Sequence, residues 1–248
     1  MRILLTNDDG IHAAALEPMA RELGTLGEVT VVVPDRDQSA TSHSLTLHRP
    51  LRIREVRPGW HSVDGTPTDC VLIAYHGLLA HRPDLVVSGI NHGPNMGEDV
   101  FYSGTVAAAI EGALQGAPAI AASLVTREPS DFIACARFVR RLAQLAMGEG
   151  FGDKRVLNVN LPHRPWEEIR GVKLTRLGTR VYSDTLIAKE DPRGRPYYWI
   201  GGQDPVWEAH EGTDFHAVHA GYISVTPLAL DLTDFKTMVD MESWRIEP

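Results

Sequence analysis

The chain has 248 residues, of which 43% are hydrophobic and 23% are charged, a composition typical of globular proteins and not of disordered ones. Its formal net charge of −8 disfavours binding to a nucleic-acid polymer, which would need a basic face. No apolar run approaches the roughly 20 residues that a membrane-spanning helix needs.

The first two-thirds of the chain alternates short apolar strands with helices. It opens at residues 2–6 with a strand that lacks the apolar stretch and cleavage site of a signal peptide, so we predict a cytoplasmic protein with no membrane partner. Further strands are predicted at 29–33, 85–87, 119–122 and 156–160, and helices at 14–23, 69–79, 103–115 and 131–146. Such alternation with continuous β-branched runs predicts a Rossmann-like, doubly wound, mostly parallel α/β fold.

Local signals place the ends of two helices. Thr68 is predicted to cap the helix over 69–79 with its hydroxyl, and Gly116 to close the helix that Ser103 opens. The helix over 131–146 carries an apolar stripe that includes Cys135 and Leu145, so Cys135 is expected to be buried. With Cys70 it makes only two cysteines, which indicate neither a disulfide framework nor a zinc site.

Two segments interrupt the alternation. Residues 45–63 predict an inserted β-ribbon, and residues 174–204 predict a β-rich excursion that we interpret as a swapped arm. The chain then returns to the core through 213–220 and a strand at 222–226, and a helix follows Thr233. We therefore predict one domain over residues 1–248, with a core of about 1–165 plus 212–232, the excursion at about 174–204 and a C-terminal tail at 233–248.

The first polar cluster, Asn7-Asp8-Asp9-Gly10, directly follows the first predicted strand. In open α/β sheets ligands bind outside the carboxyl ends of the strands, so the turn lies where a site is expected. Neighbouring carboxylates raise each other's pKa unless a cation or a hydrogen-bond donor compensates, and a divalent metal would compensate them. The alternative is an acidic surface turn that caps a helix, because Asp-Asp-Gly is common in turns.

Two further polar segments follow predicted strands. Residues 34–44 are dense in hydroxyl and short polar side chains, which could supply oxygen ligands but are also common in solvated loops. Residues 88–97 combine glycines with asparagines, and Asn91 offers a neutral amide oxygen. Two Asp carboxylates, a Ser hydroxyl and an Asn amide would form an all-oxygen site that favours Mg²⁺, Mn²⁺ or Ca²⁺ over zinc.

A candidate anion site lies at Ser103-Gly104-Thr105, before an alanine-rich helix. A helix N-terminus offers free amides and the positive end of a dipole, and the two hydroxyls add donors. Gly104 would let an anion approach the backbone closely. The alternative is a Ser103 side chain that only caps the helix. His92, in the preceding loop, is interpreted as structural or solvated.

Seven characteristic segments follow one another along the chain. They are MRILLTNDDG at 1–10, PDRDQSATSHSLT at 34–46, GTPTDCV at 65–71, PDLVVSGINHGPNMG at 83–97, YSGTVAAAIEG at 102–112, LNVNLP at 157–162 and GTDFHAVHAGYISVTPL at 212–228. Together, in this order, they resemble the survival protein E (SurE) nucleotidase family. The resemblance covers nearly the whole chain, is weakest between about 164 and 211, and is specific because the whole ordered set is present.

The resemblance implies a Rossmann-like core and a phosphatase acting on 5′- and 3′-nucleotides, sometimes also on short polyphosphate. It implies one divalent cation per subunit, Mg²⁺ or Mn²⁺, held by Asp8, Asp9, Ser39 and Asn91. It also implies homodimers, often paired into homotetramers, in which C-terminal segments are exchanged. Many members place glycine after the ligand serine, where this chain has Ala40, and this difference concerns only the local loop conformation.

The residues and the resemblance indicate the same mechanism. The cation would bind a phosphate oxygen and polarise phosphorus, while Asn95, Ser103, Gly104 and Thr105 would hold the other oxygens. The attacking group is expected to be water, oriented or deprotonated by Asp8 or activated by the cation. Asp8 and Asn95 are therefore the predicted catalytic residues.

Proteins with other functions share this alternation of strands and helices, so three alternatives were considered. A nucleotide-sensing module would bind the nucleotide in this pocket without hydrolysing it. An NAD-dependent oxidoreductase is disfavoured because the turn after the first strand is Asn-Asp-Asp-Gly and not Gly-x-Gly-x-x-Gly. The sequence also lacks the Gly-x-x-x-x-Gly-Lys-Ser/Thr loop of P-loop NTPases.

Overall fold

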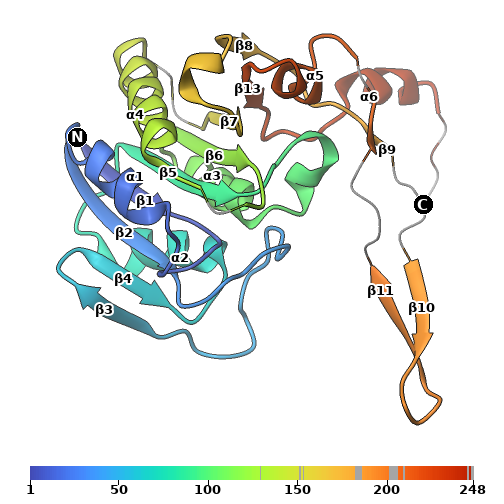
Figure 1. Ribbon diagram of the computed structural model, residues 1–248, viewed down its shortest axis with the longest axis horizontal. Coiled ribbons are helices and arrows are strands. Elements are labelled where there is room, and N and C mark those ends of the chain that lie inside the picture. The colour runs from blue at the N-terminus through green and yellow to red at the C-terminus, as the bar shows by residue number, and fades with distance from the viewer. Residues whose placement is uncertain are drawn as a thin grey trace.

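The computed structural model describes residues 1–128, 130–150, 152, 154–181, 186–200, 206–208, 210–244 and 246. Within these residues nine strands form one sheet, in the order β3-β4-β2-β1-β5-β6-β7-β13-β8 (Figure 1). The strands from β4 to β7 in this order are parallel, whereas β3 and β13 run antiparallel to β4 and β7. This arrangement confirms the predicted doubly wound, mostly parallel α/β fold.

The predicted core elements are present, with their ends shifted by a few residues. The sheet consists of β1 (Arg2–Thr6), β2 (Glu28–Pro34), β3 (Ile53–Arg57), β4 (Trp60–Val63), β5 (Leu85–His92), β6 (Ala119–Val125), β7 (Val156–Pro162), β8 (Val172–Leu174) and β13 (Ile223–Leu228). The helices are α1 (Leu16–Leu23), α2 (Pro67–Ile73), α3 (Gly104–Leu114), α4 (Ile133–Gly148), α5 (Asp214–His219) and α6 (Phe235–Met241).

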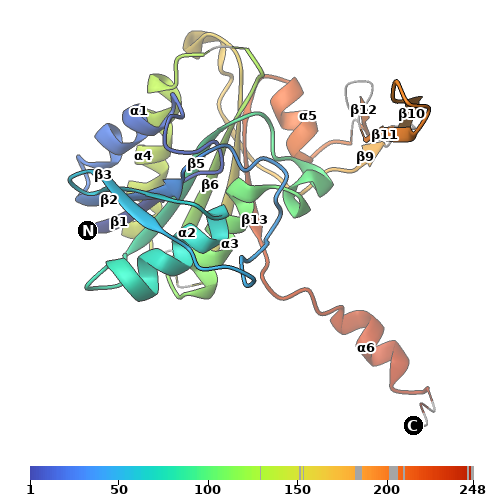
Figure 2. The same cartoon turned by 90° about the horizontal axis from the view of Figure 1, so that it is seen from below.

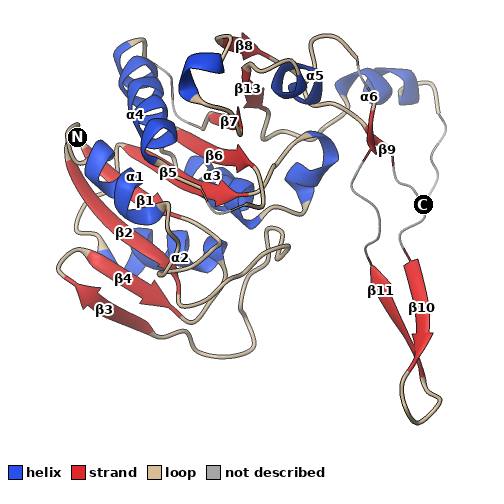
Figure 3. Cartoon of the chain, viewed as in Figure 1, coloured by secondary structure: helices blue, strands red, loops and turns tan. Residues whose placement is uncertain are grey.

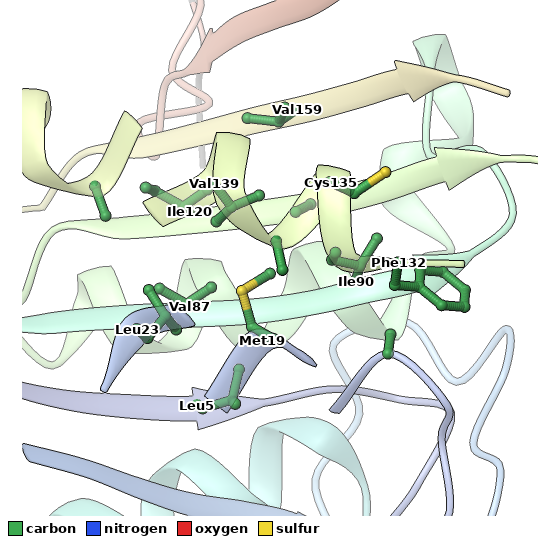
Figure 4. Close-up of a cluster of buried hydrophobic side chains, with 14 of the residues drawn as sticks. Leu5, Met19, Leu23, Val87, Ile90, Ile120, Phe132, Cys135, Val139 and Val159 are labelled. Carbon is green, nitrogen blue, oxygen red and sulfur yellow. The ribbon is translucent and has the colours of Figure 1, made fainter. Parts of the chain in front are cut away.

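The two faces of the sheet carry separate hydrophobic clusters because successive residues of a strand point to opposite faces. Leu5 lies in the cluster covered by α1 and α4, and its neighbour Leu4 lies in the cluster covered by α2 and α3. Figure 4 shows the first cluster, in which Met19 of α1 and Val139 of α4 meet the strands. Cys135 is buried there as expected, but Leu145 of the predicted stripe is exposed, while Ala146 next to it is buried.

The inserted ribbon is shorter than predicted and belongs to the main sheet. β3 and β4 form a hairpin, and β4 pairs in parallel with β2, which extends the sheet at this edge. Residues 45–52 precede the hairpin without strand structure.

The predicted cap at Thr68 is wrong, because Thr66 caps α2. The hydroxyl of Thr66 accepts from the Asp69 N–H, and the Asp69 carboxylate accepts from the Thr66 N–H, which makes a capping box. Pro67 begins the helix, where its missing N–H costs no hydrogen bond. After Ile73 the helix continues as a π-helical turn, Ala74–Leu78. The end of β5 also differs from the prediction, because the strand continues through His92.

Parts of the C-terminal third lie away from the compact core, as Figure 2 shows for α6. Two-residue strands β9 (Arg180–Val181) and β12 (Val206–Trp207) pair with each other. The hairpin of β10 (Leu186–Glu190) and β11 (Pro196–Ile200) projects from the sheet (Figure 3). Part of the predicted excursion, 182–185 and 201–204, lies outside the described residues. In the described part of the chain, no helix has the length and apolar character to cross a membrane.

Candidate active site

The polar segments predicted to form a site meet at the carboxyl edge of the sheet. β1 lies between β2 and β5, so the turns that follow these three strands are neighbours. The Gln38 N–H donates to the Asp8 carbonyl oxygen over 2.8 Å, which joins the segment after β2 to the turn after β1. The His92 N–H donates to Asp9 Oδ2 over 3.2 Å, which joins β5 to the same turn.

The turn after β1 is fixed by Asn7 and Gly10. Asn7 Oδ1 accepts from the Gly10 N–H over 3.1 Å, and Asn7 Nδ2 donates to the Gly10 carbonyl over 3.0 Å. Gly10 has a φ of +87°, and a Cβ there would lie 2.8 Å from the carbonyl carbon of Arg36. Glycine is therefore required both by the backbone conformation and by the close approach of the next loop.

Asp8 is buried and points to the start of α3. Its Oδ1 accepts from Thr105 Oγ1 over 2.5 Å, and its Oδ2 accepts from the Thr105 N–H over 3.1 Å. Burial raises the pKa of Asp8 to about 6 although the hydrogen bonds from Thr105 oppose this shift, and the charge of Asp9 adds to it. The carboxylate therefore lacks full compensation within the protein.

Asp9 points to a different set of groups. Burial raises its pKa, the hydrogen bond from the His92 N–H opposes the shift, and the charge of Asp37 adds to it. Two adjacent carboxylates with raised pKa values, and a third nearby, form a site in which bound positive charge would relieve repulsion.

Ser39 is exposed on the loop after β2. Its N–H and its hydroxyl both donate to Asp37 Oδ1, over 2.7 and 2.6 Å. The next residue, Ala40, has a φ of +59°, in the left-handed region that favours glycine. The loop is therefore turned sharply at the predicted ligand, at the position where the chain differs from the family pattern.

The remainder of this loop, residues 39–46, is attached to α2 and α3. The Ser42 N–H donates to the Tyr102 carbonyl over 3.1 Å, and the Thr46 N–H donates to Asp69 Oδ1 over 3.0 Å. His43 Nε2 lies 2.8 Å from Glu111 Oε2 on α3. These contacts hold the loop over the same face of the sheet as the start of α3.

Asn91 lies near the end of β5, in the strand and not after it. Its Nδ2 donates to the Gly93 carbonyl over 2.9 Å. Because the amide nitrogen is used there, Oδ1 is the atom that Asn91 can offer to a cation. His92 Nε2 contacts the carbonyl oxygen of Glu128, a structural role consistent with the interpretation of this residue.

The donor set fits a hard cation. It combines two carboxylates with a hydroxyl and an amide oxygen, the ligand types that Mg²⁺ and Mn²⁺ prefer. Among the described residues, no group of three or more His, Cys, Asp or Glu side chains could hold a metal ion, so a zinc-type cluster is absent from that part of the chain. Any cation at this edge would depend on the neutral ligands as well as on Asp8 and Asp9.

The start of α3 has the predicted cap. Ser103 Oγ accepts from the Val106 N–H over 3.1 Å, and the structure shows no acceptor for the Ser103 hydroxyl proton among the described residues. A Cβ on Gly104 would lie 2.9 Å from the Cβ of Asp8, so glycine permits the contact between the turn and the helix. Both donors of Thr105 are directed to Asp8, and a phosphate contact by Thr105 stays a prediction.

Asn95 is buried in an asparagine network that the sequence analysis missed. Its N–H donates to Asn160 Oδ1, its carbonyl accepts from the amides of Asn158 and Asn160, and its Nδ2 donates to Ser123 Oγ, over 2.8 to 2.9 Å. The available signal was the pair of asparagines two residues apart in the apolar run of β7, since such residues share one face of a strand.

Asp214, at the start of α5, fixes the end of the same loop. Its carboxylate accepts from the Gly97 N–H over 2.8 Å and from the Gly178 and Phe215 N–H groups over 2.9 Å. Burial raises the pKa of Asp214, and these hydrogen bonds oppose the shift. The loop that carries Asn95 is thus held from β7 on one side and from α5 on the other.

Comparisons with known proteins identify the family and the fold. The sequence pattern of the family described as survival protein SurE matches residues 3–184. The chain is 53% identical to the protein named 5′-nucleotidase SurE of Pelobacter propionicus, over 98% of this chain and 99% of that protein. It is 52% identical to the protein of the same name from Geobacter sulfurreducens, over 98% and 94%. The crystal structure of the SurE protein from Aquifex aeolicus superposes with a TM-score of 0.87 at 43% identity, over 98% of each chain.

Proposed function

Because the chain belongs to the survival protein SurE family, we propose that its candidate site is the active centre of a divalent-metal-dependent 5′-nucleotidase. The chain is an enzyme that hydrolyses nucleoside monophosphates to nucleoside and phosphate, as the curated relatives named 5′-nucleotidase indicate. The proposal adds the metal dependence, the residues of the site and activity on 3′-nucleotides.

The observation that carries the metal proposal is the incomplete compensation of Asp8 and Asp9. Both carboxyl groups have raised pKa values and lie where three neighbouring strands end. Asp8, Asp9, Ser39 and Asn91 would hold one Mg²⁺ or Mn²⁺ ion per subunit. When bound, the ion would act as a Lewis acid on a phosphate oxygen and make phosphorus more electrophilic.

The protein's own residues would position the reacting groups. Ser103 and Gly104, at the positive end of α3, and the Asn95 amide would donate to the phosphate oxygens. Asp8 would orient the attacking water and accept its proton, since its oxygens lie beside the start of α3. Asp8 and Asn95 are therefore the proposed catalytic residues, and a fixed Asn95 lowers the entropic cost of orienting the phosphate.

Phosphate release from 5′-AMP and 3′-AMP tests the proposal. EDTA should abolish release, and added Mg²⁺ or Mn²⁺ should restore it. Asp9→Asn should lower kcat by more than about tenfold, as expected when a metal-binding contact is lost. Asp84→Asn is the matched control, because Asp84 pairs with Arg2 near the amino end of β1, remote from the site. Near-normal turnover of Asp9→Asn with Mn²⁺ present would refute the metal assignment.

The same assay separates the enzyme from a nucleotide-sensing module. A sensor would bind AMP tightly, as isothermal titration calorimetry would measure, without releasing phosphate. Chelator-sensitive release supports the nucleotidase.

We also propose that the enzyme assembles as a homodimer or homotetramer with exchanged C-terminal segments, and that it is cytoplasmic. Support for the assembly comes from apolar side chains that are exposed on the projecting elements. They include Tyr198, Trp199 and Ile200 of β11 and Phe235 and Met238 of α6. Exposed apolar surface of this kind marks interaction sites.

A further inference from the structure

We infer that Thr105 is a positioning residue for Asp8, so that the start of α3 orients a metal ligand and not only the substrate phosphate. The inference rests on the proposed function and deepens it. It is argued from the N–H and the hydroxyl of Thr105, which donate to the two carboxylate oxygens of Asp8.

The contact fixes the orientation of the carboxylate. The Thr105 hydroxyl donates to Oδ1 over 2.5 Å, and the Thr105 N–H donates to Oδ2 over 3.1 Å. Two bonds to two different oxygens prevent the carboxylate plane from turning about its Cβ–Cγ bond. Both residues are buried, so water does not compete readily for these bonds. Each oxygen keeps a lone pair, which can be directed at a cation.

The surroundings hold Asp8 from the opposite side as well. The carbonyl oxygen of Asp8 accepts from the Gln38 N–H, and the Asn7–Gly10 turn fixes the backbone on either side. Gly104 lets the helix start approach Asp8, because a Cβ there would lie 3.1 Å from Asp8 Oδ2. The helix dipole adds positive potential at the carboxylate.

Some hydrogen-bond donors at the start of α3 are therefore used within the protein, and others are left for a phosphate. The Thr105 N–H is used by Asp8, and the Val106 N–H is used by the Ser103 cap. For the Gly104 N–H the structure shows no acceptor within the described residues. A phosphate would therefore find the Gly104 amide and the Ser103 hydroxyl proton, while Thr105 could reach it only by releasing Asp8.

Thr105→Val and Thr105→Ser test the inference as a matched pair. Valine keeps the shape and the N–H but loses the hydroxyl, whereas serine keeps both donors. Free Mn²⁺ is measured by electron paramagnetic resonance without nucleotide, and kcat and KM for AMP are measured at saturating Mn²⁺. Thr105→Val should weaken Mn²⁺ binding by about tenfold and lower kcat, with KM changed by less than about twofold, as for an outer-shell partner of a metal ligand. Thr105→Ser should restore Mn²⁺ affinity to within about threefold of wild type.

Other outcomes would overturn the inference. Unchanged Mn²⁺ affinity with a raised KM, and weaker inhibition by inorganic phosphate, would make Thr105 a phosphate contact. If Mn²⁺ affinity, KM and inhibition by inorganic phosphate were all unchanged, Thr105 would be a helix residue without a role in the site. If Thr105→Val does not fold by circular dichroism, Thr105→Ala replaces it and the same comparison with Thr105→Ser decides. A wild-type protein that binds no Mn²⁺ would instead refute the proposed function.

Discussion

Asn95 shows how a single side chain can be placed by residues remote in sequence. Four hydrogen bonds from β6 and β7 hold its backbone and its amide nitrogen. Of the two asparagines on β7, only Asn160 makes a bond to each backbone group of Asn95. Asn158 makes one bond, and its Oδ1 is buried without a partner in the described residues.

Asn160→Ala should therefore destabilise the protein more than Asn158→Ala does. Loss of Asn160 leaves the buried Asn95 N–H without an acceptor, which costs about 1–3 kcal/mol, whereas loss of Asn158 leaves the Asn95 carbonyl with its other donor. Urea unfolding of both variants measures this difference, and each variant opens a similar cavity, so the comparison isolates the hydrogen bonds. KM for AMP should rise more in Asn160→Ala if Asn95 binds phosphate. Equal losses in the two variants would contradict the ordering.

Among single residues, the sequence predicted the polar side chains that follow strands, but not the asparagines of β7 that hold Asn95 in place. Asp8, Asp9 and Ser103 could be proposed as site residues because polar residues at strand ends and helix starts have a recognisable local pattern. Asn158 and Asn160 lie inside an apolar run, where periodicity indicates only a strand. Their partner is 63 to 65 residues away, so its identity depends on the order of strands in the sheet.

At the scale of elements, the loop of residues 39–46 depends on α3 for its position. His43 contacts Glu111, and Gln115 Nε2 donates to the same carboxylate over 2.8 Å. The hydrogen bond from His43 is the main cause that lowers the pKa of Glu111, with opposing burial and a further contribution from Gln115. Since the pKa is lower in the folded state, the ionised form of Glu111 is stabilised by folding.

We expect the free energy of unfolding of Glu111→Gln to depend less on pH below neutrality than that of the wild type. The stabilisation by Glu111 is fully present above its unfolded-state pKa, which is near 4.5, and is lost as the pH falls through the lower folded-state pKa. The free energy of unfolding should therefore fall by about 1 kcal/mol at pH 7 in the variant, and the difference from wild type should shrink below pH 4.5.

Urea unfolding at several pH values measures this effect. Glu17→Gln is the control, because the Glu17 side chain is 68% exposed and its pair with Arg57 lies on the surface. A constant difference between Glu111→Gln and wild type from pH 7 to pH 4 would show that the contact with His43 does not depend on the charge of Glu111.

Helices and strands were predicted correctly where the local pattern of apolar residues and capping residues determines their position. α3 and its Ser103 cap agree with the sequence, but the start of α2 does not. Both Thr66 and Thr68 can cap a helix, and the choice of Thr66 depends on its N–H donating to the Asp69 carboxylate and on Pro67 at the first helical position. The sharp turn at Ala40 could not be predicted, because alanine gives no signal of a positive φ.

At the scale of the whole molecule, α6 exposes an apolar face that packs against nothing in the described part of the chain. Phe235, Met238 and Val239 are exposed and follow the spacing of one helix face. The hairpin of β10 and β11 exposes aromatic residues as well, and Figure 1 shows it extending away from the sheet. The pattern of residues 174–204 predicted a swapped arm, the resemblance to the family predicted exchange of the C-terminal segments, and this exchange stays a prediction.

Replacing the apolar face of α6 should dissociate the proposed assembly. Phe235→Glu combined with Met238→Glu places charges where apolar contact is expected, so the mass measured by light scattering should fall towards one chain of 27.3 kDa. Lys236→Ala, on the same helix, should keep the mass of the wild type. A wild-type protein that is already monomeric, or an unchanged mass in the double variant, would contradict the assembly.

The bond between Asp214 and Gly97 has a consequence for biosynthesis. The two residues are 117 positions apart, and the bond fixes the end of the loop that carries Asn95. Because a chain emerges from the ribosome with its N-terminal part first, the strands β1 to β7 can assemble before Asp214 is translated. Unfinished or prematurely terminated chains would then expose a sheet with its carboxylates in place but with a loosely held Asn95 loop. Such fragments should not consume nucleotides in the cell.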